Sequence, residues 1–245
     1  MPRYFLEVAY NGTRYSGFQR QLNANTVQAE VEKAFETLHR QTVFLTGSSR
    51  TDAGVHALQN YFHFDFEGFI HSQFLYKTNA ILPEDIVVKS LTLVGDEAHC
   101  RFDADSREYQ YRIFKSKNPF LKNFSFYFPY KLDRAALQKA ADVVKNQTMF
   151  HSFCKTNTQV QNFHCIIYKS QWTFEGDEMI YTIESNRFLR GMVRLITASL
   201  LRVGRGSLSL QDFEGLFSND VKAAYSVPAH GLFLRRVKFP EGMLG

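Results

Sequence analysis

The spacing of apolar residues predicts strands and helices in alternation along the whole chain. A period of two, or a short apolar run between turn residues, predicts a strand, and apolar residues that recur every three or four positions predict a helix. Strands are predicted at residues 3–10, 43–46, 59–66, 86–94, 107–114, 164–174, 179–184 and from Leu232 onward. Helices are predicted after a cap at Asn25, at 72–81, 133–145 and 188–203, and in a short segment after Ser209.

Each half of the chain therefore has the predicted order β-α-β-β-α-β, with the short helix after Ser209 as an insertion. This order predicts an α+β fold of two similar lobes with mainly antiparallel sheets, divided into domains 1–100 and 101–245. If the two sheets join side by side, a central cleft separates the elements of the two halves.

Composition places the chain among folded proteins with a sizeable core. It has 245 residues, 44% of them hydrophobic, and 29 Lys and Arg against 24 Asp and Glu give a net charge of +5. A positive charge favours an anionic partner, and the 24 Phe and 12 Tyr include rings that could stack on unpaired bases. A basic protein without such a partner has the same composition.

The cysteine count and the apolar segments bear on the compartment. Three cysteines are an odd number, which disfavours a disulfide framework and indicates a reducing, cytoplasmic location. The first residues alternate as a strand with a charge among them, unlike a signal peptide. The most apolar helix, 188–203, carries Arg190, Arg194 and Arg202, so no membrane span is expected.

The segment from Arg50 to His56, with the sequence RTDAGVH, contains the first candidate for chemistry. It places Asp52 between an arginine and Gly54 in a turn that connects two predicted strands. An aspartate in such a turn either stabilises the turn itself or acts as a ligand or catalyst. An acid–histidine pair of Asp52 with His56 is a further alternative.

Two basic or aromatic patterns occur in the second half. Arg187, Arg190 and Arg194 are spaced i, i+3 and i+7, which on the predicted helix forms one basic stripe. Such a stripe suits solvent, phosphate or a buried carboxylate. On the strand 107–114, Tyr109 shares a face with the next tyrosine, and one of these rings could contact a base or pack over a helix.

A cluster of histidine and cysteine suggests zinc as an alternative. His151 and Cys154 are followed by His164 and Cys165. Adjacent residues of a strand point to opposite faces, so the second pair is poorly suited to one ion. No metal site is therefore predicted, and Cys154 as a nucleophile has weaker support still.

The motifs together resemble the tRNA pseudouridine synthase A family over nearly the whole chain. The similarity is sharpest in the segment 50–57, RTDAGVHA. The other matching segments, in order, are YNGT at 10–13, YSGFQ at 15–19, TVQ at 26–28, RF at 101–102, REYQY at 107–111, FLR at 188–190, MVR at 192–194 and PAHGL at 228–232.

This resemblance implies an isomerase that converts uridine to pseudouridine in the anticodon stem-loop of tRNA, at tRNA positions 38, 39 and 40, without a cofactor. It implies Asp52 as the catalytic nucleophile, Arg194 as its ion-pair partner and Arg50 as the residue that enters the space of the flipped base. Tyr109, which stacks on the uracil, Arg187 and Arg190, which hold phosphates, and Leu232 are implied as substrate-binding residues.

The family resemblance further implies a homodimer that binds tRNA with both subunits, and a fold with the Asp loop in the first lobe and the Tyr and Arg partners in the second. Four positions depart from the usual pattern: Phe18, Ser49, Gly191 and Leu195. They affect the expected RNA contacts more than the chemistry. A non-catalytic RNA-binding module with the same fold remains the alternative function.

Overall fold

The computed structural model describes residues 1–156, 160–218 and 222–244. The chain packs as two compact units, one of Met1–Asp105 with Phe233–Gly245 and one of Ser106–Leu232. The predicted ranges, 1–100 and 101–245, place the last strand in the second lobe, whereas its residues from Phe233 onward pack with the first unit.

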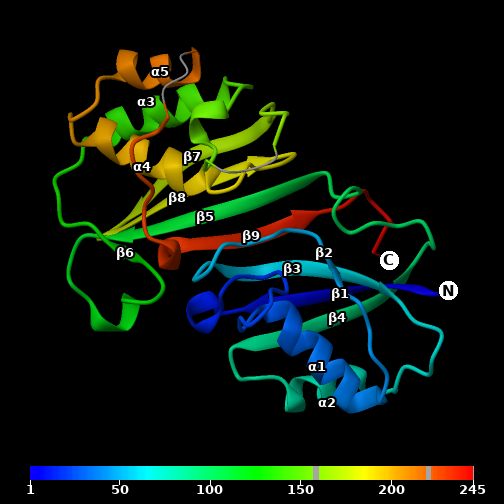
Figure 1. The fold of residues 1–245 in the computed structure, drawn as a ribbon. Helices are drawn as coiled ribbons and strands as arrows, with labels where there is room; N and C mark the ends of the chain where they lie inside the picture. The colour runs from blue at the N-terminus through cyan, green and yellow to red at the C-terminus, as the bar shows by residue number, and fades with distance from the viewer. Residues whose placement is uncertain (157–159, 219–221, 245) are drawn as a thin grey trace. The chain divides into compact units, whose positions relative to one another are not determined.

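The first unit contains an open sheet in the order β4-β1-β3-β9 (Figure 1). Strand β1 is antiparallel to β3 and β4, β9 is parallel to β3, and the two-residue β2 pairs with β3. The elements are β1 (Arg3–Tyr10), α1 (Val27–His39), β2 (Thr46–Gly47), β3 (His56–Asp65), α2 (Phe74–Ile81), β4 (Ile86–Val94) and β9 (Leu232–Lys238). The order predicted for the first half is confirmed.

Alternating phenylalanines of β3 form the core under α1. The ring of Phe62 stacks on Phe18 with a centroid distance of 4.4 Å, and Phe64 meets Phe35 of α1 edge to face at 5.4 Å. All four side chains are almost fully buried. Because side chains of a strand alternate, the same strand presents its other residues to the opposite face of the sheet.

The start of α1 and the strand predicted at 43–46 differ from the sequence-based expectation. Thr26, not Asn25, caps α1, with its hydroxyl oxygen accepting the N–H of Ala29 at 3.4 Å. Only Thr46 and Gly47 pair as a strand. The N–H of Leu45 donates to the Glu32 carboxylate and its carbonyl accepts from the Gln28 amide. Side chains of α1 thus satisfy backbone groups that a strand partner would otherwise bind.

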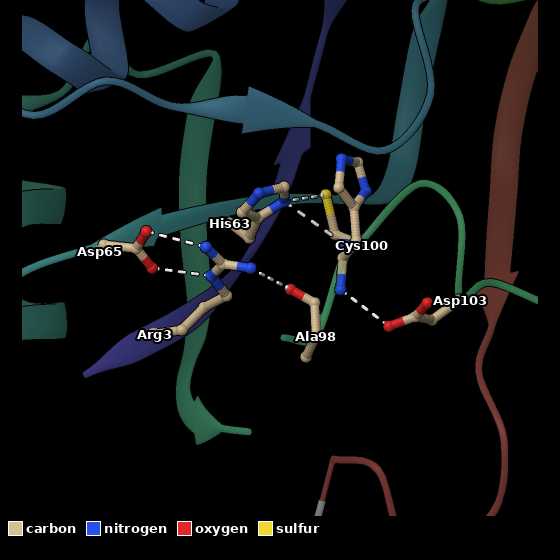
Figure 2. A network of polar contacts seen from close by, with 7 residues as sticks. Arg3, His63, Asp65, Ala98, Cys100 and Asp103 are labelled. Atoms are coloured by element: carbon tan, nitrogen blue, oxygen red, sulfur yellow. Dashed lines mark hydrogen bonds and ion pairs between the residues drawn. The ribbon is translucent and has the colours of Figure 1, made fainter. Parts of the chain in front are cut away.

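A polar network attaches the turn after β4 to the face of this sheet that points away from α1 (Figure 2). The guanidinium of Arg3 donates to both carboxylate oxygens of Asp65, at 2.7 and 2.8 Å, and to the carbonyl of Ala98 at 3.0 Å. His63 Nδ1 lies 3.2 Å from the thiol of Cys100 and 3.4 Å from its backbone nitrogen. The turn is therefore anchored to β1 and β3 at separate points.

The buried imidazole of His63 makes the stability of this unit depend on pH. Burial, followed by the charges of His99 and Arg3, lowers the pKa of His63 to about 4. From about pH 6.5 down to pH 4 the unfolded chain therefore binds a proton that the folded chain does not. We expect the free energy of unfolding to fall on acidification, by about 2 kcal/mol at pH 5 from this residue.

Urea unfolding curves recorded between pH 7 and pH 5 measure this loss. The variant His63→Gln keeps a hydrogen-bond acceptor but does not titrate, so its stability should vary less with pH over this range. Equal pH dependence of the two proteins would contradict the assignment to His63.

The second unit contains the antiparallel strands β5, β8 and β7 in that order, with the short β6 parallel to β5. Helix α3 packs on β7, and α4 and α5 pack with α3 (Figure 1). The elements are β5 (Ser106–Phe114), β6 (Phe126–Tyr127), α3 (Arg134–Lys145), β7 (Ile167–Glu175), β8 (Glu178–Ser185), α4 (Met192–Gly204) and α5 (Leu210–Ser218). The predicted helices and long strands are present, and β6 was missed because two residues carry no periodic pattern.

Two predicted boundaries in this unit are wrong. Helix α4 begins at Met192 rather than 188, because Gly191 before it has a φ of +73°, in the left-handed region. Strand β7 begins at Ile167 rather than 164, and His164 makes only an isolated bridge with Met149. In the segment before α4, the carbonyl of Arg190 accepts the N–H of Lys155, which lies outside the helix.

The described residues thus combine mostly antiparallel strands with five α-helices, which confirms the α+β class. Among these five, none has both the length and the apolar character that crossing a membrane requires.

Candidate active site

The loop between β2 and β3 folds as the tight turn that the sequence predicts. The carbonyl of Asp52 accepts the N–H of Val55 at 3.1 Å, and Gly54 has a φ of +76° that few other residues adopt. Arg50 is exposed and Asp52 is half-buried. The turn therefore fixes the backbone of a half-buried aspartate.

The segment 10–18 clamps this loop from the side. The hydroxyl of Tyr10 lies 2.8 Å from that of Thr51, both buried. The carbonyl of Thr51 accepts the N–H of Phe18 at 3.2 Å, and Gly54 donates its N–H to the carbonyl of Tyr15 at 3.3 Å. Residues on both sides of Asp52 are thus fixed, which limits the positions that its carboxylate can take.

Asn60 holds the entry to the loop, and sequence reasoning missed it. Its amide nitrogen donates to the carbonyl of Ser49 at 2.8 Å and to the hydroxyl of Tyr10 at 3.3 Å. The side chain is fully buried in the middle of β3. A buried asparagine costs free energy unless its amide is bonded. Nothing in the sequence signals this burial, because β3 also carries Gln59, His63 and Asp65.

His56 begins β3, so it does not share a helical turn with Asp52 as the sequence alternative supposed. Its Nδ1 accepts the N–H of Gly12 at 3.1 Å, and its ring stacks on Phe233 with a centroid distance of 4.6 Å. His56 therefore holds Gly12 against the loop.

We expect the change Gly12→Ala to destabilise the first unit by about 1–3 kcal/mol, as overpacking does. A Cβ at this position would lie 2.0 Å from the carbonyl oxygen of Val55, so either the loop or residues 10–14 must move. Urea unfolding of the variant measures the loss. Gly95→Ala is the matched control, because a Cβ there meets nothing within 4 Å. Equal stability of the two variants would show that the loop moves freely.

In the second unit, Arg194 lies in the first turn of α4 and holds the segment before β9. Its Nε donates to the carbonyl of Val227 at 2.8 Å, and a terminal nitrogen lies 3.5 Å from the hydroxyl of Ser226. The side chain is half-buried. The guanidinium is thus fixed in orientation.

The other predicted site residues of this unit occupy different elements. Tyr109 lies on β5, largely buried, and meets Phe188 edge to face at 5.1 Å. Arg187 is half-buried and Arg190 is exposed, and both precede α4, so the predicted helical stripe is wrong. Leu232 is buried at the start of β9.

In the histidine and cysteine cluster, the two cysteines lie in the packed interior, whereas His164 is exposed. Cys154 and Cys165 are buried, and burial raises the pKa of the Cys165 thiol to about 11. That thiol faces the sulfur of Met192 at 4.0 Å. Across residues 1–156, 160–218 and 222–244, no group of three or more His, Cys, Asp or Glu side chains is arranged to hold a metal ion.

A family model described as tRNA pseudouridine synthase matches residues 7–103 and 147–240. The chain belongs to the tRNA pseudouridine synthase family. Proteins named tRNA pseudouridine synthase A are similar over nearly their full length. The relative from Parabacteroides distasonis is 42% identical over 98% of this chain and 97% of its own, and the one from Staphylococcus aureus strain Newman is 35% identical over 99% and 92%.

Membership in this family confirms the predicted function and enzyme class, an isomerase that acts on uridine in tRNA. The matched ranges include the Asp52 loop and Arg194, whereas Tyr109 lies in the interval between them. Asp52 and Arg50 belong to the first unit and the other predicted site residues to the second, so the pairing of Asp52 with Arg194 stays a prediction.

Proposed function

We propose that this pseudouridine synthase modifies uridines of the tRNA anticodon stem-loop, at positions 38, 39 and 40, with Asp52 as the catalytic carboxylate. The observation that carries the proposal is the clamped turn at residues 50–55. It lies inside the range that the family model matches, and it contains the half-buried Asp52. A carboxylate that only stabilised its own turn would not require clamps on both sides.

The reaction needs few groups. The N1–C1′ bond of uridine breaks, the free uracil rotates, and a C5–C1′ bond forms. The proton from C5 is lost and N1 gains one, so atoms and electrons balance without an oxidant or an energy source. An ionised carboxylate suits attack on the sugar, attack on the base, or assistance to glycosidic cleavage.

Arg194 is the proposed partner of Asp52, with the two units meeting around a cleft that receives RNA. A guanidinium next to a partly buried carboxylate offsets the loss of hydration and orients its oxygens. Arg194 is already held by the carbonyl of Val227, so it suits the role of a fixed counter-charge. Tyr109 is proposed to stack on the uracil while the base turns.

Access to a uridine in a stem requires the base to leave its stack, at a cost of a few kcal/mol. The exposed Arg50 is proposed to enter the vacated space, since it lies two residues before Asp52. Arg187 and Arg190 are proposed to hold phosphates, and Leu232 to contact the substrate. We further propose that the protein acts in the cytoplasm as a homodimer.

The purified protein incubated with unmodified tRNA transcripts tests this proposal. Carbodiimide mapping should detect pseudouridine at positions 38 to 40 and none in transcripts with cytidine there. Pseudouridine only in another arm would refute the proposed site. Tight binding of tRNA without any pseudouridine would favour the non-catalytic RNA-binding module.

A further inference from the structure

A cavity of about 230 Å³ lies in the first unit beside the catalytic loop. Its wall includes Arg50 of that loop, Phe18 beneath, and three residues of the turn after β4: His99, Arg101 and Phe102. None of its lining residues, all of them in the described part of the chain, is acidic. The cavity therefore suits a ligand that is anionic or flat. Of the predicted catalytic and substrate-binding residues, only Arg50 belongs to it.

The side chains at its rim have the chemistry that unpaired RNA requires. The ring of Phe102 is 74% exposed. Aromatic faces stack on unpaired bases regardless of sequence, and arginines bind the adjoining phosphates. The exposed Arg101 lies over this ring, with its guanidinium carbon 5.7 Å from the ring centroid, and the exposed Arg50 lines the same cavity.

The turn that carries Phe102 is built to hold it in place. His99 Nδ1 accepts the N–H groups of Arg101 at 3.1 Å and Phe102 at 3.4 Å, and its ring lies 4.2 Å from that of Phe102. Below the turn, the contacts of Cys100 with His63 and of Ala98 with Arg3 fasten it to the sheet (Figure 2). A ring fixed before binding loses little conformational entropy on binding.

The position of the cavity limits which nucleotide could occupy it. Arg50 in its wall is two residues from Asp52, so at most about 7 Å of backbone separates them. The cavity is smaller than the roughly 300–1,000 Å³ of pockets that enclose drug-sized ligands, and thus suits one ring system.

We propose that this cavity binds one unpaired base of the tRNA, close in sequence to the target uridine, with the base stacked on Phe102 and its phosphate held by Arg101. The proposal rests on the proposed function, because it takes the anticodon loop as the source of unpaired nucleotides.

Equilibrium binding of an unmodified tRNA transcript tests the protein side. The change Phe102→Ala should weaken binding by about 5- to 150-fold, the range for loss of a stacked base, and Phe102→Tyr should restore it. Phe69→Ala is the control, because Phe69 is 78% exposed in the same unit but outside the cavity. The change Arg101→Gln should reduce the slope of log Kd against log salt by about 1.

Abasic transcripts test the RNA side. Removal of one loop base should weaken binding to the wild-type protein as much as Phe102→Ala does, with no further loss when both changes are combined. Equal losses from Phe69→Ala and Phe102→Ala, or independent losses in the combined test, would overturn the subsite. Wild-type protein that makes no pseudouridine would overturn the proposed function instead, and the binding comparison would still decide whether Phe102 contacts RNA.

Discussion

The change Asp52→Asn is expected to lower pseudouridine formation by at least about a thousandfold while tRNA binding persists, as removal of a catalytic nucleophile does elsewhere. Asparagine has the same shape, and the turn bond uses the backbone carbonyl of Asp52, so the loop should keep its conformation. Only the negative charge and the oxygen of the proposed nucleophile are lost. Single-turnover assays with tritiated uridine in tRNA, together with a binding titration, measure the two quantities separately.

The matched control for this experiment is Asp96→Asn. Asp96 is an exposed carboxylate in a turn of the same unit, and it lines no part of the site. Its variant should retain the wild-type rate. Appreciable turnover by a clean preparation of the Asp52→Asn protein would exclude Asp52 as the nucleophile.

The change Arg194→Ala is expected to lower the rate by at least about a hundredfold, the usual cost of removing one oriented donor from an active site. Alanine removes both the proposed counter-charge of Asp52 and the bond to the carbonyl of Val227. Lysine keeps the charge without the planar fork of donors, so Arg194→Lys should recover only part of the activity.

Two measurements separate the catalytic role of Arg194 from a structural one. Arg202→Ala removes another half-buried arginine of α4, away from its first turn, and should leave the rate unchanged. Thermal unfolding of Arg194→Ala reports whether the segment at Val227 is lost. If activity falls only as much as the fraction of folded protein, Arg194 has a structural role at that segment and no catalytic one. Wild-type rates in Arg194→Ala would contradict the proposed ion pair with Asp52.

The sequence predicted those elements whose pattern is local. Strands β1 and β4 and helix α3 match the expected ranges closely, because apolar residues dominate both strands and Asp133 caps α3. Most of the range 43–46 does not pair as a strand, because side chains of α1 bind the backbone of Leu45. That competition depends on residues more than ten positions away, which periodicity does not record.

In the candidate site, too, only the features formed by neighbouring residues were predictable. The turn at Asp52 was predictable because Gly54 and its neighbours form it from adjacent residues. The clamps from Tyr10 and Asn60 were not, because each joins positions about ten to fifty residues apart. The helical stripe of arginines failed at Gly191, where a left-handed backbone conformation delays the helix by a turn.

The return of β9 to the first unit has a consequence for synthesis on the ribosome. His56, which borders the Asp52 loop, stacks on Phe233, and β3 pairs with β9 only at His56 and Ala57. The ribosome must therefore translate the whole of Ser106–Leu232 before this contact can form. A nascent chain that stops short of β9 lacks the flank of its Asp52 loop, so this loop reaches its final packing only after the second unit has been synthesised.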